Sequence, residues 1–139
     1  MLKNLKVFLM KSYDLIIKEG HLDTFGHVNN ATYLEIFEEA RWEVLNEKGV
    51  TVREIQQSKK GPVLLNVNLG FKKEIFLRTK IKVISQMLDI KKNKIMVVKQ
   101  TIINEKDDVC AEATFEIGLM DLNFRKLIPL TDLWVNLFS

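Results

Sequence analysis

The chain has 139 residues, with 21 Lys and Arg against 18 Asp and Glu, so its formal net charge is +3. That length is the usual size of one domain, and so weak a positive charge does not indicate a protein that binds duplex nucleic acid. The single Cys excludes an intrachain disulfide and a metal site built from several Cys, and it suits a reducing compartment. We therefore expect one domain over residues 1–139, with no metal and no nucleic-acid partner.

The sequence offers no segment that would place the chain in or across a membrane. No apolar run approaches the roughly 20 residues that a membrane-spanning helix needs. Residues 1–11 mix Lys with short apolar pieces and lack the sustained apolar stretch of a secretory signal. These observations predict a cytoplasmic protein without a membrane partner.

The first predicted elements are a strand and a long helix. A strand is expected over about 12–19, with Tyr13, Leu15 and Ile17 on one face. A helix is expected over about 31–48, because apolar residues recur there at helical spacing: Tyr33, Phe37, Ala40 and Val44, widened by Leu34, Ile36 and Leu45.

Capping residues mark the ends of this helix. Asn29 and Asn30 precede it and are good N-cap types, and Gly49 is a reasonable C-terminal stop. A short helix is expected after Thr51, because Thr51 and Glu54 have the spacing of a capping box.

The second half of the chain alternates apolar and polar residues, which is typical of half-buried strands. Four strands are expected, at about 63–71, 81–87, 94–104 and 109–119. The connections at 91–93 and 104–108 are short, which favours antiparallel neighbours. Pro129 is expected to open a last helical turn that carries Leu130, Leu133, Trp134 and Leu137.

Together these elements predict an α+β fold in which one long helix packs across a curved antiparallel sheet. The apolar stripe of the helix must be buried, and the sheet is the only large surface on offer. The sheet would still have open edges and some apolar residues on its outer face. Association with further copies of the chain would cover both.

One segment, His21–Tyr33, is richer in chemically active residues than structure alone requires. It places Asp23, His27 and two Asn in a loop that leads into a helix N-terminus. Unpaired N–H groups at such a terminus can stabilise the oxyanion that forms when a carbonyl is attacked. A nearby carboxylate can act as nucleophile or as base for water. These are the parts of an acyl-transfer or hydrolysis site.

The same segment resembles the signature of the 4-hydroxybenzoyl-CoA thioesterase family of hotdog-fold proteins. The matching residues are Asp23, Gly26, His27, Val28, Asn29, Asn30 and Tyr33, followed by Phe37, Glu38, Ala40 and Arg41. The resemblance implies a long helix wrapped by an antiparallel sheet, assembled as a homodimer or homotetramer. It also implies hydrolysis of an acyl thioester of coenzyme A or of acyl-carrier protein, with coenzyme A as part of the substrate and no separate cofactor.

The resemblance further implies roles for individual residues. Asp23 falls on the catalytic acid of the family, and Asn30 falls where a backbone N–H polarises the thioester carbonyl. Glu38 is a second candidate acid, as in a related hotdog branch, and His27 is a candidate for a part in the chemistry. The candidate substrate-binding residues are Gly26, Asn29, Tyr33, Lys91, Lys92 and Lys94, the three Lys toward the phosphates of coenzyme A.

Plainer interpretations stand beside these. Asp23 can be a turn residue that caps its own loop, the lysines can be a solvated turn, and Cys110 is expected to be inert packing. Two other functions also remain open. One is an enoyl-thioester hydratase or dehydratase that uses His27 with Glu38 or Glu39, and the other is a non-catalytic acyl-CoA binding module.

Overall fold

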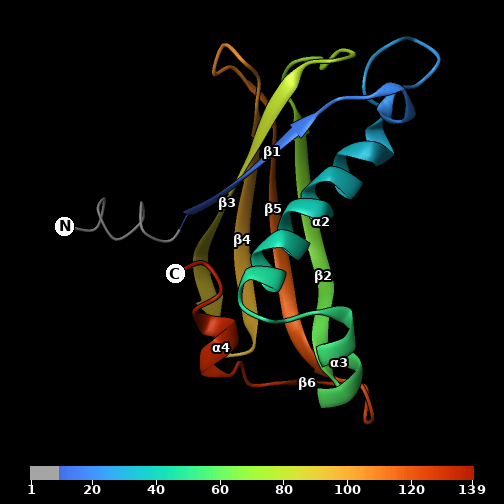
Figure 1. The fold of residues 1–139 in the computed structure, drawn as a ribbon. Coiled ribbons are helices and arrows are strands. Elements are labelled where there is room, and N and C mark those ends of the chain that lie inside the picture. The colour runs from blue at the N-terminus through green and yellow to red at the C-terminus, as the bar shows by residue number, and fades with distance from the viewer. Residues whose placement is uncertain (1–9) are drawn as a thin grey trace.

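The computed structural model describes residues 10–139, in which one antiparallel sheet curves around a long helix (Figure 1). In chain order the elements are β1 (Met10–Ile16), a 3₁₀ turn η1 (Glu19–His21), α2 (Asn30–Glu47), α3 (Val52–Ser58), β2 (Lys60–Phe71), β3 (Lys80–Lys91), β4 (Ile95–Ile103), β5 (Val109–Asp121), β6 (Lys126–Ile128) and α4 (Asp132–Val135). The strands are ordered β1-β3-β4-β5-β2, and β6 pairs with the end of β5. The predicted α+β fold with a single long helix is confirmed.

Helix α2 lies across one face of the sheet and supplies the centre of the core (Figure 1). The buried stripe on α2 follows the predicted spacing, and the ring of Phe37 packs edge-on against Phe115 of β5 with 5.7 Å between ring centres. Leu34 is the exception, because it points away from the sheet and is exposed. The predicted stripe is therefore right except at that one residue.

The two ends of α2 differ in how they are capped. Gly49 follows the helix with a φ of 80°, a left-handed conformation that costs glycine little, so the predicted stop is confirmed. Asn29 is the N-cap, but its side chain accepts no hydrogen bond from the first turn. The expected side-chain cap is thus wrong. The Asn29 backbone N–H is held instead by the carbonyl of His21 at 3.2 Å.

Strand β2 is an edge strand, and the expectation that it is half-buried is wrong for its central part. Its partner on one side is β5, and no strand within residues 10–139 pairs with its other side. A bulge between Leu64 and Asn66 also shifts its register. As a result the side chains of Leu65, Val67 and Phe71 are exposed rather than buried under α2.

The C-terminal segment closes the end of the sheet that lies away from the start of α2 (Figure 1). Strand β6 was not expected from the sequence, because it is only three residues long. Helix α4 begins after Thr131 rather than at Pro129, and the side chains of Trp134, Leu137 and Phe138 are buried. The Leu130 N–H donates to the carbonyl of Asn93 at 2.8 Å, which ties this segment to the turn between β3 and β4.

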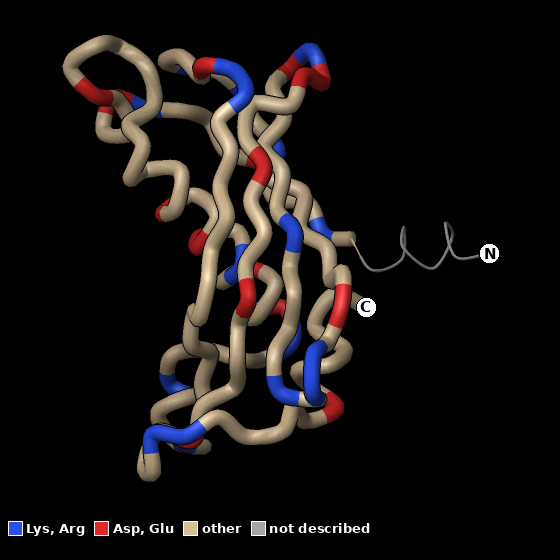
Figure 2. The backbone as a smooth tube through the Cα atoms, turned by 180° about the vertical axis from the view of Figure 1, so that it is seen from behind, with Lys and Arg blue, Asp and Glu red and all other residues tan. Residues whose placement is uncertain are grey.

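Charged residues lie at the turns at both ends of the sheet and also along its strands (Figure 2). Within residues 10–139 no helix is long and apolar enough to cross a membrane. The prediction that residues 1–11 are not a secretory signal falls mostly on residues 1–9, which lie outside the described residues.

Candidate active site

The loop before α2 is a tight turn closed by backbone pairing. Leu22 and Val28 form an isolated antiparallel bridge, and inside it the Asp23 N–H donates to the carbonyl of His27 at 3.0 Å. Gly26 lies between them with a φ of 85°, a conformation that a residue with a side chain rarely adopts. Gly26 therefore shapes the turn that brings Asp23 and His27 to the same place.

A second strand-like contact fixes this loop to the rest of the protein. The Val28 N–H donates to the carbonyl of Ile75 at 3.0 Å, and His27 forms a bridge with Phe76. Val28 and Ile75 are both buried, so the anchor is part of the core. The loop is thus held at both of its ends, which positions the start of α2 beside it.

The carboxylate of Asp23 has one oxygen used by the loop and one facing His27. Oδ1 accepts a hydrogen bond from the Phe25 N–H at 2.8 Å. The prediction that Asp23 caps its own loop is therefore confirmed. Oδ2 lies 3.8 Å from Nδ1 of His27, and both side chains are partly exposed. The Phe25 ring stacks on the His27 ring with 6.3 Å between centres. No residue within 10–139 donates a hydrogen bond to Oδ2.

The first N–H groups of α2 are open. The Asn29 carbonyl accepts from the Thr32 N–H at 2.9 Å, which begins the helix. No acceptor is found among residues 10–139 for the N–H of Asn30 or Ala31, since neither has a helical partner and no side chain caps them. These donors, at the positive end of an 18-residue helix, are suited to an oxyanion.

A hollow of about 230 Å³ opens beside the start of α2. It is lined by His27, Val28, Asn30, Tyr33, Phe71, Lys72, Lys73 and Glu74. The ring of Tyr33 packs edge-on against Phe71 at 5.0 Å, which forms an aromatic wall. Burial raises the pKa of the Tyr33 hydroxyl, so Tyr33 stays neutral at this wall near neutral pH. Three predicted site residues, His27, Asn30 and Tyr33, thus meet at one hollow.

Glu38, the second candidate acid, lies elsewhere in the chain fold. It follows Asn30 by eight residues, which is about 12 Å along a helix axis. Its Oε1 lies 3.4 Å from Nε1 of Trp42, which donates to it, and it lines a different cavity. Glu39 accepts a hydrogen bond from the hydroxyl of Tyr13 at 2.8 Å. The described chain therefore pairs His27 with Asp23 and not with the two glutamates that a hydratase mechanism would use.

The lysines at 91, 92 and 94 lie at the end of the sheet away from the loop. Strand β3 starts at Lys80, next to β1 and the loop, and ends at Lys91, about 36 Å further along an extended strand. The ammonium of Lys91 is paired with Glu116 at 2.6 Å. Lys72 and Lys73 line the hollow instead. In the sequence, these two lysines can be recognised because they directly follow the alternating apolar residues of β2.

Two further kinds of site, a metal centre and a reactive cysteine, were also compared with the structure. Among residues 10–139, no group of three or more His, Cys, Asp and Glu could hold a metal ion. Cys110 is buried on β5, and burial raises the pKa of its thiol, so it is not a ready nucleophile at neutral pH. The prediction that Cys110 is packing agrees with this position.

An antiparallel sheet wrapped around one long helix, with a carboxylate and open N–H groups where the helix starts, defines the class of hotdog-fold thioester enzymes. The sequence model of the thioesterase-like superfamily matches residues 17–133. The chain belongs to this superfamily, so the resemblance seen in the sequence and the expected class of thioester hydrolase are confirmed.

Among characterised relatives, the chain is similar to the long-chain acyl-CoA thioesterase FadM of Escherichia coli K12. The two are 30% identical over 115 residues, which cover 82% of this chain and 86% of FadM. The probable thioesterase YbaW from Escherichia coli has a solved structure that matches with a TM-score of 0.78 at 26% identity, over 91% of this chain and 94% of that one.

A third similar structure is that of the hypothetical protein SAV2348 from Staphylococcus aureus, solved in complex with CoA. It matches with a TM-score of 0.85 at 13% identity, over 92% of this chain and 80% of that one. At this identity the match establishes the hotdog fold.

Proposed function

We propose that this protein hydrolyses acyl-CoA thioesters to a free acid and coenzyme A. The observation that carries the proposal is the hollow at the open start of α2, which His27 lines, with the Asp23 carboxylate 3.8 Å from the His27 ring. The names of two similar proteins support the substrate class: FadM is a long-chain acyl-CoA thioesterase, and SAV2348 was solved with CoA.

In the proposed mechanism, the thioester carbonyl lies at the start of α2 and accepts hydrogen bonds from backbone N–H groups at Asn30. Negative charge that develops on this oxygen is stabilised by those donors and by the positive helix end. Asn29 and Gly26 hold the loop in the shape that aims these groups. Tyr33 and Phe71 form a wall beside the acyl group.

Asp23 takes one of two roles in this scheme. As a general base, Asp23 removes a proton from water, whose oxygen attacks the carbonyl carbon. As a nucleophile, it forms an acyl anhydride that water then opens. In both routes the C–S bond breaks and the leaving thiolate takes up a proton, so water is the only co-reactant and no cofactor is needed. His27 orients the carboxylate.

Coenzyme A, rather than a carrier protein, is the proposed partner of the hollow. Lys72 and Lys73 line it, where an ammonium can meet a phosphate of the coenzyme A part of the substrate. Lys73 is already paired with Asp108 at 2.7 Å, which makes Lys72 the better candidate. This replaces the hairpin of Lys91, Lys92 and Lys94 as the proposed phosphate contact within one protomer.

The working unit is proposed to be a homodimer, or a homotetramer built from dimers. The support is β2, whose open edge carries exposed apolar side chains, with Leu65 43% and Phe71 52% exposed. An open apolar edge strand is normally covered by pairing or association. The whole chain is proposed to act as one domain in the cytoplasm, where the free thiol of Cys110 would stay reduced.

The test is release of free thiol from a panel of short-chain, long-chain and aromatic acyl-CoAs. Wild type is expected to hydrolyse at least one of them, and Asp23→Asn to lower kcat by about a thousandfold or more. Glu38→Gln is the matched control, expected to stay near the wild-type rate. Wild-type turnover by Asp23→Asn would refute the role of Asp23, and loss of turnover in Glu38→Gln alone would move the catalytic acid to Glu38.

Two rival functions give different results in the same assay. A hydratase would add water to crotonyl-CoA, followed by loss of its ultraviolet absorbance, without releasing thiol. A binding module would bind acyl-CoA saturably and release no product over hours.

A further inference from the structure

Positively charged side chains from distant parts of the chain meet at the end of the sheet that lies away from the Asp23 loop. Lys60 at the start of β2 and Lys126 at the start of β6 both lie opposite Asp121, the last residue of β5. The β3–β4 turn joins this end, because the carbonyl of Asn93 accepts from the N–H of Leu130, just beyond β6. The members of this surface, which we call the basic end (Figure 2), are Lys59, Lys60, Lys91, Lys92, Lys94, Arg125 and Lys126.

The positive charge of the basic end is largely uncompensated. Lys91 is paired with Glu116 at 2.6 Å, whereas the other six members are exposed and form no ion pair within residues 10–139. The acidic residues near these seven cations are Asp89, Glu116, Asp121 and Asp132. An excess of exposed positive charge at one end of a nearly balanced chain points to an anionic partner.

An exposed aromatic ring lies among these cations. Phe124 is in the turn between β5 and β6 and is 76% exposed. The turn is fixed by Asp121, whose Oδ1 accepts from the Phe124 N–H at 3.0 Å and whose carbonyl accepts from the Arg125 N–H at 2.8 Å. Transfer of such a ring out of water is favourable, so the turn holds in place an apolar group that a partner can bury.

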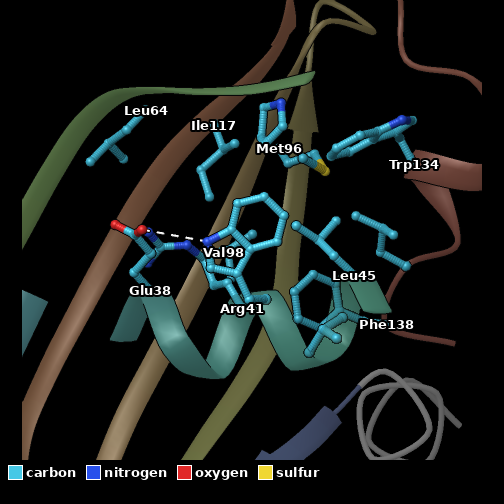
Figure 3. Close-up of a pocket in the computed structure, with 13 residues that line it drawn as sticks. Glu38, Arg41, Leu45, Leu64, Met96, Val98, Ile117, Trp134 and Phe138 are labelled. Carbon is cyan, nitrogen blue, oxygen red and sulfur yellow. Dashed lines mark hydrogen bonds between the residues drawn. The ribbon is translucent and has the colours of Figure 1, made fainter. Parts of the chain in front are cut away.

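One further cation without an ion pair among residues 10–139, Arg41, does not belong to the basic end. Arg41 lines an interior cavity together with Trp134 and Phe138 (Figure 3), and it donates to the buried Gln100. Its charge is therefore not available to a partner at the surface. The basic end consists only of side chains from turns and strand ends.

We propose that the basic end is a docking surface for an anionic phospholipid membrane, with the Phe124 ring inserted at the level of the headgroups and the surrounding cations against lipid phosphates. Cations near an anionic bilayer and a buried apolar group are each weak signals, and together they give reversible binding. Single-stranded nucleic acid fits less well, because it is bound by several aromatic residues along a groove, whereas Phe124 is a single ring on a turn.

Docking of this kind differs from the membrane contact that the sequence argues against. The sequence offers no spanning segment, and no helix within residues 10–139 could cross a membrane, but binding at a surface requires neither. The Asp23 loop lies at the opposite end of the sheet, so the hollow beside it stays open while the basic end is docked. The proposal holds whether or not the protein hydrolyses thioesters.

Cosedimentation of the full chain with vesicles tests the proposal. The vesicles contain phosphatidylcholine alone or with about one third phosphatidylglycerol, which makes them anionic. Wild type is expected to bind the anionic vesicles about tenfold or more tightly than the neutral ones, and to lose this preference at about 0.5 M salt, where charges are screened. Equal binding to both kinds of vesicle, or binding to neither, would overturn the proposal. Tighter binding to a single-stranded oligonucleotide than to anionic vesicles would assign the surface to nucleic acid instead.

Two triple variants with the same net charge locate the contact. The first replaces three members of the basic end by Gln and is expected to bind anionic vesicles about a hundredfold more weakly than wild type. Its substitutions are Lys60→Gln, Lys94→Gln and Lys126→Gln. The control replaces three exposed lysines without ion pairs at the opposite end of the sheet and is expected to stay within about threefold of wild type. Its substitutions are Lys18→Gln, Lys82→Gln and Lys106→Gln. Equal weakening in the two variants would reduce the effect to overall charge and refute a defined surface.

The ring is tested by a separate pair of variants. Phe124→Ala is expected to weaken binding to anionic vesicles by about tenfold, since it removes the apolar group that is buried. Phe25→Ala, which changes an exposed ring in the Asp23 loop, is the matched control and should bind as wild type does. Thermal melts confirm that each variant is folded. Wild-type binding by a folded Phe124→Ala protein would contradict insertion of the ring.

Discussion

The two halves of helix α2 carry polar groups in opposite ways. At its start the helix has open N–H donors beside a hollow that His27 of the preceding loop lines, and Asp23 of the same loop lies 3.8 Å from His27. In its second half the side chain of Arg41 reaches the sheet, where it lies over the Phe115 ring and donates to the buried Gln100. The N–H groups at the start of the helix have no partner among residues 10–139, whereas the Arg41 guanidinium is held by Gln100 and Phe115.

This difference separates chemistry from packing along a single helix. Groups that react must reach substrate and change their bonding, so they are found where the fold leaves donors and acceptors unused. Groups deep in the core must be satisfied by the fold, because an unpaired buried polar atom costs about 1–3 kcal/mol. Changes at the start of α2 should therefore alter activity with little effect on folding, and changes in its second half should do the reverse.

The largest expected effect is on stability, at Phe115. This ring is fully buried, packs on Phe37 and supports the Arg41 guanidinium. Phe115→Ala is expected to lower the free energy of unfolding by about 3–5 kcal/mol, because it leaves a cavity and removes the ring under the guanidinium. Urea unfolding followed by circular dichroism measures the change.

Phe25 is the matched control for Phe115, since it is a phenylalanine in the loop before α2 and is 83% exposed. Phe25→Ala is expected to change the free energy of unfolding by less than about 0.5 kcal/mol. A loss of several kcal/mol at Phe25, or none at Phe115, would break the division between the two halves.

The next effect is on activity, at His27. His27→Gln removes the ring that faces Oδ2 of Asp23 at 3.8 Å and is expected to lower kcat by about tenfold to a hundredfold, because the carboxylate loses its orientation. KM and the thermal melt should stay close to wild type. Steady-state thiol release gives the constants, and a raised KM with unchanged kcat would instead make His27 a substrate-binding residue.

A smaller effect is expected at the lysines. Lys72→Gln should raise KM for an acyl-CoA by up to about fivefold, the loss of one exposed charge pair worth about 0.2–1 kcal/mol. The matched control, Lys91→Gln, lies at the other end of the sheet and should leave KM unchanged. An acyl-pantetheine substrate carries no nucleotide phosphates, so Lys72→Gln should not affect its KM. If both substrates respond equally, Lys72 acts on something other than the phosphates.

The smallest effect concerns pH, at Tyr13 on β1. Burial, followed by the hydrogen bond from its hydroxyl to Glu39, raises the pKa of Tyr13 from 10.0 to about 12. A pKa raised in the folded state stabilises the protein fully below pH 10 and loses that contribution as the pH rises from 10 toward 12. Wild type should therefore lose more unfolding free energy over this range than Tyr13→Phe, measured by urea unfolding at both pH values. Parallel losses in the two proteins would contradict the assigned pKa.

Much of the fold could be predicted from periodicity, and the failures have physical causes. The long helix and the strands β3, β4 and β5 repeat a simple apolar pattern, because each has one face on the core. Strand β2 has a similar pattern but lies at the edge of the sheet with a bulge, so alternation did not predict its burial. A strand as short as β6 exists only because β5 is there to pair with it.

The candidate site divides in the same way. Asp23, His27 and Asn30 are close in sequence; one Gly-containing turn brings Asp23 to His27, and Asn30 follows at the start of α2, so local pattern and resemblance were enough to select them. Lys72 joins them from the end of β2, a contact that depends on how the sheet places that strand. Glu38 is only eight residues beyond Asn30, yet the rise of the helix carries it away from the hollow.

By itself, the sequence determined the elements of this protein and the polar loop at the start of its long helix, because helix spacing, strand alternation and turn residues are local properties. Only the tertiary structure decided which lysines border the hollow, that Asn29 leaves the first helical N–H groups open, and that Arg41 is held over Phe115 beside an apolar cavity. Each of these depends on residues far apart in the chain, whose meeting is set by the order and curvature of the sheet.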